Sequence, residues 1–504
     1  MKYIEILDTT LRDGEQMKGV SFSPNEKFAI AKILLEKLGV DRIEISSARV
    51  AGGELKSAQK ICQWAKENSF LEKIEILGFV DGDQSLEWVR RAGGRVMNLL
   101  AKGSLNHVTV QLGKTLNQHI NDIAGVFLKA KKRKIKINAY LEDWSRGLEE
   151  SPEYVFKLTE SLVKLGVGKI ILADTLGVLS PEETRAHIKL MVDRFPKVHF
   201  DFHAHNDYGL ATANSLAAIM AGVRGIHTTI NGLGERAGNT HLAEIVALIN
   251  DKTGFACKVD EKFINKTSKL VERFSGMRIS PGKPIVGENI FTQTAGVHAD
   301  GDKKGNLYIA KITSERFGRK REYALGKLSG KASLEQNLKN TGIELTKEEK
   351  EKVLREIVEL GGKKYSITPT DLPFIISDVL GTPLKKDIEI VSVFVSSGSD
   401  SIPTATVKIK IKGKEYPGVA SGDGGYDAFM NALKKILVTK LKIKLPKLID
   451  YEVRIPPGGK TDALVEAKII WNKNGDIFST IGIDSDQVMA AVKATEKMLN
   501  LISK

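Results

Sequence analysis

The sequence predicts a (β/α)8 barrel followed by a helical linker and an α+β domain. Its 504 residues exceed the usual size of one compact domain. In the first half, a short run of β-branched residues, a polar tip and an amphipathic helix recur about every 30 residues, the length of one strand and its crossover helix. Eight such units are typical of a closed barrel of parallel strands. The expected strands are 3–9, 42–48, 74–80, 96–102, 136–142, 169–175, 199–205 and 225–231.

The sequence also marks where two of the intervening helices begin. Residues 23–26 and 180–183 each supply an N-cap serine, a proline at the first helical position and a glutamate three residues after the serine. After the first of these segments, apolar residues recur at helical spacing and form one face. They are Phe28, Ala31, Leu34, Leu35 and Leu38. We therefore expect helices that alternate with the strands, as a barrel requires.

The rest of the chain divides into two further parts, because strand periodicity disappears near residue 275 and returns near 386. The intervening part holds the loop 296–308 and helical segments, one of which opens with a capping box at 346–349. After it, three strands and a helix occur twice, with the helices expected at 424–437 and 484–499. The expected domains are a barrel with an extension (1–321), a helical linker (322–385) and an α+β domain of a kind usually used for dimerisation or ligand sensing (386–504).

Composition and charge limit the classes of function. No apolar run approaches the roughly 18 residues that a membrane helix needs, and the charged N-terminus does not resemble a secretory signal. Cys62 and Cys257 form no disulfide framework, which is typical of cytosolic proteins. The net charge of +14 includes basic runs at 131–134 and 318–322, but no nucleic-acid motif accompanies them. We expect a cytoplasmic protein that binds neither membranes nor nucleic acid.

Polar residues gather where the predicted strands end. In a (β/α)8 barrel the carboxyl ends of the strands carry the chemistry, and nearly every strand here ends in a polar side chain. These residues are Arg12, Asp13, Glu44, Lys102, Glu142, Asp143, Asp174, Thr175, His203, His205 and the loop 231–239. A barrel that served only as a scaffold would not need this set, so we expect an active site at this end.

His203 and His205 lie two residues apart at the end of the seventh strand, so both point to the same face. Two imidazoles are poor core residues, and with carboxylates nearby they form a standard donor set for a divalent metal ion. Asp13 follows the first strand, which meets the eighth in a closed barrel, and the eighth neighbours the seventh. Asn239, at the end of the strand-eight loop, adds an oxygen donor. Water or substrate would complete the shell, as Lewis-acid catalysis requires.

Four segments carry a resemblance to a known family. LDTTLRDGEQ (7–16), HAHNDYGLATANS (203–215), NGLGERAGNT (231–240) and GVHADG (296–301) resemble the barrel enzymes that condense acetyl-CoA with an α-keto acid. That family includes the 2-isopropylmalate, homocitrate and (R)-citramalate synthases, and the likeness covers essentially the whole chain. It implies a divalent metal ion (Zn, Mn or Mg) and acetyl-CoA as co-substrate. The metal ligands that it implies are Asp13, His203, His205 and Asn239.

The same resemblance implies roles for further residues. Arg12 would polarise the keto oxygen, where negative charge develops as an alkoxide forms. Thr175 would bind the substrate carboxylate. The family-like base for the acetyl methyl proton is His298, presented by the same or the neighbouring chain, with Glu142 working beside it. An imidazole titrates near neutral pH, as such a base should. Hydrolysis of the CoA thioester product would make release effectively irreversible.

Within this family the keto acid is the open question. IEISSARV (43–50) and YLEDWSRG (140–147) resemble the (R)-citramalate synthases, which use pyruvate in isoleucine biosynthesis. Ala299 stands where the usual bacterial 2-isopropylmalate synthase has glutamine. The alternative is a 2-isopropylmalate synthase, which takes 2-ketoisovalerate in leucine biosynthesis.

Three bulky residues near the carboxyl ends of strands three to five bear on this choice. A site for pyruvate must fill the space that an isopropyl group would occupy, and Leu77, Leu100 and Tyr140 are placed to wall such a pocket. The alternative is that they are ordinary side chains of the barrel core.

The C-terminal repeat resembles the leucine- or isoleucine-sensing domain of the same family. Tyr426 and Asp427 lie at an expected helix start in SGDGGYDAF and are the candidate effector contacts. We expect isoleucine as the effector and a homodimer as the assembly. A second structural layer without a sensing role is the alternative.

Three other classes of protein fit part of the pattern. A metal-dependent amidohydrolase normally carries its H-x-H on the first strand, where this chain has Arg12 and Asp13. A lyase of the hydroxymethylglutaryl type is expected to have a cysteine in its strand-eight loop, where this chain has Glu235 and Arg236. A non-catalytic amino-acid sensor would have lost the metal donors, which are complete here. Release of free thiol from acetyl-CoA with separate keto acids would distinguish these classes.

Overall fold

The computed structural model describes residues 3–50, 52–294, 296–305, 307–308, 310–341, 343–362, 367–381, 387–455, 464–474 and 476–502. They form two compact units. The first comprises Met1–Thr292 and Ile309–Arg321, and the second comprises Gln293–Tyr308 and Glu322–Lys504. The segment Gln293–Tyr308, which we had expected to extend the barrel domain, therefore groups with the second unit.

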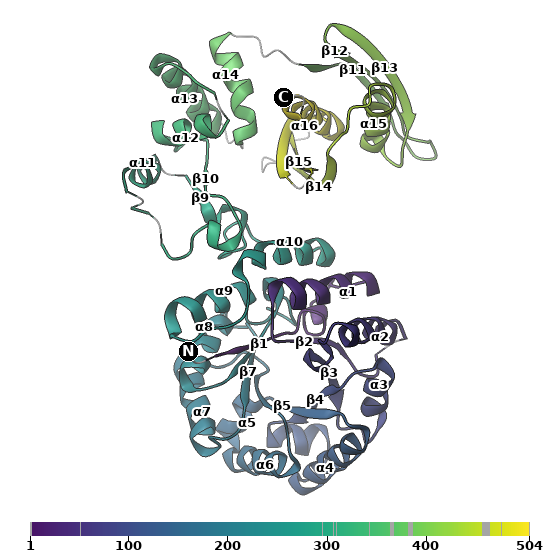
Figure 1. Ribbon diagram of the computed structural model, residues 1–504, viewed down its shortest axis with the longest axis vertical. Helices are drawn as coiled ribbons and strands as arrows, with labels where there is room; N and C mark the ends of the chain where they lie inside the picture. Colours follow the sequence, from purple (N-terminus) through teal and green to yellow (C-terminus); the bar gives the residue numbers. More distant parts are fainter. Residues whose placement is uncertain are drawn as a thin grey trace. The chain divides into compact units, whose positions relative to one another are not determined.

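The first unit is built on a closed barrel of eight parallel strands in sequence order (Figure 1), which confirms the predicted fold class. Each strand lies within the predicted run, because β-branched and apolar residues buried on both faces form parallel strands. The strands are β1 (Glu5–Asp8), β2 (Arg42–Ser47), β3 (Ile74–Phe79), β4 (Val96–Lys102), β5 (Lys136–Glu142), β6 (Ile170–Asp174), β7 (Phe200–Ala204) and β8 (Gly225–Thr228).

Helices surround the barrel (Figure 1) and bury its outer surface in one large apolar core. Two of them begin where the sequence predicts, since Ser23 and Ser180 each cap a helix in a complete capping box with proline in the first turn. The helices of this unit are α1 (Pro24–Lys32), α2 (Gly52–Glu67), α3 (Gln84–Ala92), α4 (Leu116–Arg133), α5 (Trp144–Glu150), α6 (Pro152–Leu165), α7 (Pro181–Arg194), α8 (Ala211–Ala221), α9 (Leu242–Leu248) and α10 (Ile264–Ser275).

The second unit starts with helices that have a small core of their own, as expected for a helical linker. Leu334, Val353, Ile357 and Leu372 are fully buried in this core. The elements are β9 (Thr292–Gln293), α11 (Gly296–Gly305), β10 (Glu322–Tyr323), α12 (Lys331–Thr341), α13 (Lys347–Gly362) and α14 (Leu372–Leu380).

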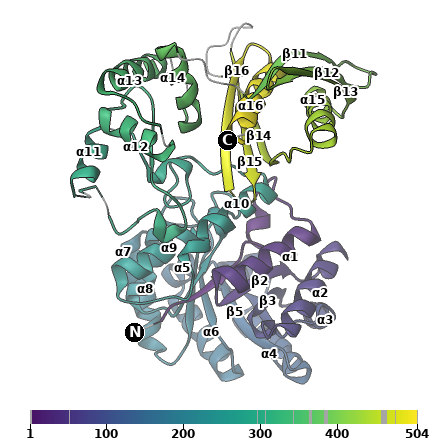
Figure 2. The same cartoon turned by 45° about the horizontal axis from the view of Figure 1, so that its top comes forward.

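The C-terminal part of the second unit has the predicted βββα repeat (Figure 2). Each half is a three-stranded antiparallel sheet with one helix packed on it, and the two helices share an apolar core that includes Phe429 and Trp471. The first half is β11 (Ile388–Ser396), β12 (Thr404–Ile411), β13 (Lys414–Ser421) and α15 (Gly425–Lys434). The second half is β14 (Lys447–Arg454), β15 (Val465–Lys473), β16 (Asp476–Asp484) and α16 (Gln487–Ile502).

Within the described ranges, every helix is too short or too polar to cross a lipid bilayer.

Candidate active site at the carboxyl end of the barrel

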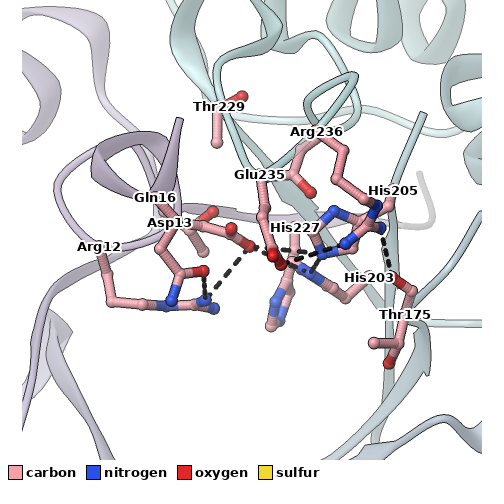
Figure 3. A network of polar contacts seen from close by, with 12 residues as sticks. Arg12, Asp13, Gln16, Thr175, His203, His205, His227, Thr229, Glu235 and Arg236 are labelled. Atoms are coloured by element: carbon pink, nitrogen blue, oxygen red, sulfur yellow. Dashed lines mark hydrogen bonds and ion pairs between the residues drawn. The ribbon is translucent and has the colours of Figure 1, made fainter. Parts of the chain in front are cut away.

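Asp13, His203 and His205 meet at the carboxyl end of the barrel (Figure 3). The Nε2 atoms of the two histidines lie 3.3 Å apart, and one Asp13 oxygen lies 3.2 Å from His203 Nε2 and 3.9 Å from His205 Nε2. All three side chains are buried. The convergence follows from topology, since β1 pairs with β8, β8 with β7, and the two histidines alternate onto the same face of β7.

This trio has the electrostatics of a cation site. Burial lowers the pKa of His203 below its ordinary value and that of His205 to about 4, so both imidazoles are neutral and their Nε2 atoms can offer lone pairs. Burial opposes ionisation of Asp13, but the charge of Arg12 and the contact with His203 together hold the carboxyl pKa well below its usual range. A carboxylate and two imidazole nitrogens aimed at one point, without a cation, would leave their lone pairs uncompensated.

Asn239, the fourth residue expected to supply a ligand, lies beside His205 in the backbone. It forms an isolated β-bridge with His205, and its buried Oδ1 has no hydrogen-bond partner in the part of the chain that the structure describes. Its Nδ2 is engaged, donating to the Leu233 carbonyl at 3.2 Å, so the side chain is oriented with the oxygen free. Carboxylate, imidazole and amide oxygen donors fit Zn, Mn or Mg, so the residues present suit a divalent metal ion.

Arg12 lies beside this group and is held by neighbouring polar side chains. Its Nε donates to Glu44 at 2.5 Å, its Nη2 donates to the Tyr140 hydroxyl at 3.2 Å, and its Nη1 lies 3.2 Å from Asp13. Burial opposes its positive charge, but Glu44 and Asp13 raise the pKa of Arg12 above its ordinary value. A fixed guanidinium next to the donor trio can stabilise an oxyanion there.

Thr175 lies on the loop after β6, and a second arginine ties that loop in place. Arg236 Nη2 donates to the Thr175 carbonyl at 2.7 Å, while Arg236 pairs with Asp207 at 2.7 and 2.9 Å. Thr175 Oγ1 accepts from the Asp143 backbone N–H at 2.8 Å. The loops after β6, β7 and β8 are thereby linked around the site, and sequence reasoning had not assigned any role to Arg236 or Asp207.

Leu77, Leu100 and Tyr140 do come together, in an apolar cluster inside the barrel that is separate from the main core. Ile171 and Ala173 of β6 complete the cluster. Leu77 and Tyr140 are buried, Leu100 is partly buried, and the Tyr140 hydroxyl contacts Arg12. The three residues that we expected to wall a pocket therefore share one surface beside the guanidinium.

The two candidates for the base lie in different units. Glu142 ends β5 and forms an ion pair with Lys102, which ends the neighbouring strand β4. His298 belongs to α11 in the second unit, where its ring stacks on Tyr308 with centroids 4.2 Å apart and its Nδ1 lies 3.3 Å from Gln293 Oε1. The structure brings Glu142 to the barrel end and describes His298 only within its own unit.

The candidate effector residues lie at the first turn of α15. Tyr426 stacks on Tyr451 and Phe429 at centroid distances of 5.0 and 5.9 Å, and its hydroxyl lies 2.8 Å from Thr495 Oγ1. Asp427 accepts hydrogen bonds from the Asp423 backbone and from Asn431.

A cavity of about 880 Å³ opens at the opposite end of the barrel, where the strands begin. Arg42, Lys136 and Lys169 line it, and each is paired with a carboxylate of the same wall, Glu5 or Glu72. Among the residues described, the one group of three metal donors lies at the carboxyl end and not in this hollow.

Three family models cover almost the whole chain. Residues 3–271 match the HMGL-like family, residues 285–365 match the homocitrate synthase post-HMGL domain-like family, and residues 366–503 match the LeuA allosteric (dimerisation) domain. This order of domains agrees with the architecture of barrel, helical part and C-terminal repeat.

Named relatives extend the match to full length. A Methanopyrus kandleri chain provisionally named (R)-citramalate synthase is 34% identical over 97% of this chain and 95% of its own. The chain belongs to the HMGL-like condensing acyltransferases. The (R)-citramalate synthase of Methanocaldococcus jannaschii is 32% identical over 99% of both chains, and the 2-isopropylmalate synthase of the same organism is 34% identical over 99% of this chain and 94% of its own. Two relatives in one organism with different names match about equally. Overall similarity therefore does not distinguish between the two keto acids, and only residues of the barrel can.

Proposed function

We propose that this chain is an (R)-citramalate synthase, which condenses acetyl-CoA with pyruvate and hydrolyses the thioester to (R)-citramalate and CoA. Its family membership supports the condensation of acetyl-CoA with a 2-oxoacid in branched-chain amino-acid biosynthesis. The observation that carries the choice of pyruvate is the apolar cluster of Leu77, Leu100 and Tyr140 beside Arg12.

The cluster favours a small keto acid because its side chains are rigidly placed. Tyr140 is 2% exposed and Leu77 5%, and the Tyr140 hydroxyl is anchored by polar contacts, so the wall does not yield easily. An apolar pocket discriminates by only about 1–3 kcal/mol per methylene through attraction, but overpacking a rigid wall costs a similar amount for each added carbon. A rigid wall of this kind favours the methyl group of pyruvate over the larger isopropyl group of 2-ketoisovalerate.

In the proposed reaction a base removes a proton from the acetyl methyl group, and the resulting carbanion forms a carbon–carbon bond with the keto carbon of pyruvate. The keto oxygen takes the negative charge and then a proton. Arg12 stabilises that charge, and Thr175 holds the pyruvate carboxylate. Water then cleaves the carbon–sulfur bond and releases the CoA thiol. We assign the base to His298 with Glu142, on their resemblance to the family pattern.

Asp13, His203, His205 and Asn239 would hold the divalent metal ion of this site. The chemistry that such an ion supplies is Lewis-acid polarisation of a bound keto group. The neutral imidazoles, the ionised Asp13 and the free Asn239 oxygen support this assignment.

The deciding experiment is the release of free thiol from acetyl-CoA with pyruvate, 2-ketobutyrate and 2-ketoisovalerate in separate assays, with chiral analysis of the product. We expect the highest kcat/KM with pyruvate. A preference for 2-ketoisovalerate would instead establish a 2-isopropylmalate synthase.

We also propose feedback inhibition by isoleucine through the C-terminal repeat, in a homodimer. The match of residues 366–503 to the LeuA allosteric (dimerisation) domain supports this, and Tyr426 and Asp427 are the proposed contacts. A chain ending near residue 385 should lose inhibition by isoleucine. Inhibition of the full chain by leucine and not by isoleucine would contradict the proposal.

A further inference from the structure

Charged and polar side chains fill much of the barrel interior between the active site and the opposite end. Barrel interiors are usually packed with branched apolar residues. Here Glu44, Glu75, Asn98, Asp201 and His227 are each at most 1% exposed. They form a closed ring of polar contacts through Arg42 and Tyr140.

One arc of this ring leads from Arg42 to the active site through His227. Arg42 Nη2 donates to Asp201 Oδ2 at 2.6 Å, His227 Nε2 lies 3.2 Å from the same oxygen, and His227 Nδ1 lies 3.0 Å from the Tyr140 hydroxyl. That hydroxyl in turn accepts from Arg12 Nη2 at 3.2 Å. A continuous path of four hydrogen bonds thus connects Arg42 to Arg12.

The donors and acceptors along this arc have one consistent arrangement. Asp201 forms an ion pair with Arg42, so its carboxylate only accepts hydrogen bonds. His227 Nε2 must then carry the hydrogen. A neutral imidazole carries a single hydrogen, so Nδ1, which lies 3.0 Å from the Tyr140 hydroxyl, is left as an acceptor for the Tyr140 O–H. The lone pairs of the phenol oxygen are thereby directed to Arg12.

We infer that His227 is a positioning residue: it orients the Tyr140 hydroxyl and, through it, the guanidinium of Arg12. This inference rests on the proposed condensation at Arg12. Without His227, the Tyr140 proton would turn to Glu44, whose Oε2 lies 3.3 Å away and already accepts from Arg12 Nε. Tyr140 would then compete with Arg12 for one carboxylate oxygen, and the guanidinium would lose its fixed direction.

Two amide substitutions separate the two hydrogen bonds of His227. The amide of His227→Asn takes the place of Nδ1 and can accept from Tyr140, whereas that of His227→Gln reaches Asp201 and leaves Tyr140 without a partner. We expect His227→Gln to lower kcat/KM for pyruvate roughly ten- to thirtyfold, as a lost hydrogen bond to a charged network does, and His227→Asn to lower it less than about threefold. The dissociation constant of pyruvate, measured by calorimetry without acetyl-CoA, should follow the same order.

The decisive control repeats both variants in a Tyr140→Phe background. If His227 acts through the Tyr140 hydroxyl, the Gln and Asn variants should then be equal, because the group that they position is gone. A second control is His199→Phe, which removes an imidazole 3.1 Å from the other oxygen of Asp201 without touching Tyr140, and should leave kcat/KM close to that of the wild type.

Equal losses for the Gln and Asn variants when Tyr140 is intact would overturn the inference, as would a difference that survives Tyr140→Phe. A different result would contradict the proposed function: a wild-type enzyme that prefers 2-ketoisovalerate to pyruvate. The same variants are then measured with that acid, and they test the role of His227 equally well.

Discussion

The barrel interior and the core of the C-terminal repeat bury opposite kinds of side chain. The interior of the barrel holds ionised and hydrogen-bonding groups such as Arg42, Glu75 and Asp201, all buried and linked to one another. The C-terminal core is apolar, with Phe429, Trp471 and Met498 fully buried among aliphatic side chains.

This difference indicates which of the two regions supports a reactive site. Burying a charge costs several kcal/mol even when it is paired, whereas burying apolar surface stabilises by about 25 cal/mol per Å². A fold selected only for stability would fill its barrel as it fills its C-terminal core. The charged interior is therefore best explained as the support of a reactive site, and substitutions in the two regions should affect different quantities.

The largest expected effect is on turnover, from His203→Ala in the donor trio. Loss of one ligand deforms the site, so we expect kcat/KM to fall more than about a thousandfold and bound metal, measured by elemental analysis, to fall with it. His199→Ala, directly before β7, is the matched control and should keep both metal and activity.

Near-native activity of His203→Ala after treatment with a chelator would refute the metal site. Asp13→Asn should behave as His203→Ala does, since the neutral amide cannot balance a divalent charge.

The strands and the donor trio could be predicted from the sequence, but the ring around His227 could not. The β-branched runs and the H-x-H spacing are local patterns, and closure of the barrel then brings Asp13 to His203 without further information. Asp201 and His227 lie inside strands. The contacts of a polar side chain there cannot be predicted until the register of the neighbouring strands is known. Likewise, nothing in the segment 293–308 shows that it groups with the second unit.

The second prediction addresses the C-terminal core. Phe429 is fully buried on α15, so Phe429→Ala should lower the free energy of unfolding of this part by about 3–5 kcal/mol. Phe394 on β11 is 70% exposed, and Phe394→Ala should cost less than about 1 kcal/mol. Calorimetric unfolding of the full chain measures both. Equal effects of the two variants would show that this core is not the stabilising element we infer.

The third prediction tests the cost of buried polar groups in the barrel. Asp8 of β1 is buried, and one of its oxygens has no hydrogen-bond partner among the residues described here. Burial raises its pKa to about 7. Because the folded pKa exceeds the unfolded value, the contribution of Asp8 to stability is lost as the pH rises from about 4 to about 7.

Asp8→Asn should therefore match the wild type near pH 4 and exceed its unfolding free energy by about 2–4 kcal/mol above about pH 7, measured by urea denaturation across that range. Asp193, an exposed partner of Lys189, provides the control, and Asp193→Asn should show no such trend. A constant difference across the pH range would mean that Asp8 is ionised throughout in the folded protein.

The smallest expected effect is a change in keto-acid preference, from substitutions of apolar residues inside the barrel. Leu77 is apolar but lies inside the barrel beside Tyr140 and not in the main core. Leu77→Ala should lower kcat/KM for pyruvate and raise the ratio for 2-ketobutyrate over pyruvate about five- to fiftyfold, because each added methylene is worth about 1–3 kcal/mol once space exists for it. Leu172→Ala on β6 removes the same atoms from the main core and should destabilise the fold without changing that ratio. Leu100→Ala should act as Leu77→Ala does, since it opens the same wall. An unchanged ratio in both leucine variants would mean that Leu77 and Leu100 only pack the barrel. The apolar cluster would then serve stability alone, as the C-terminal core does.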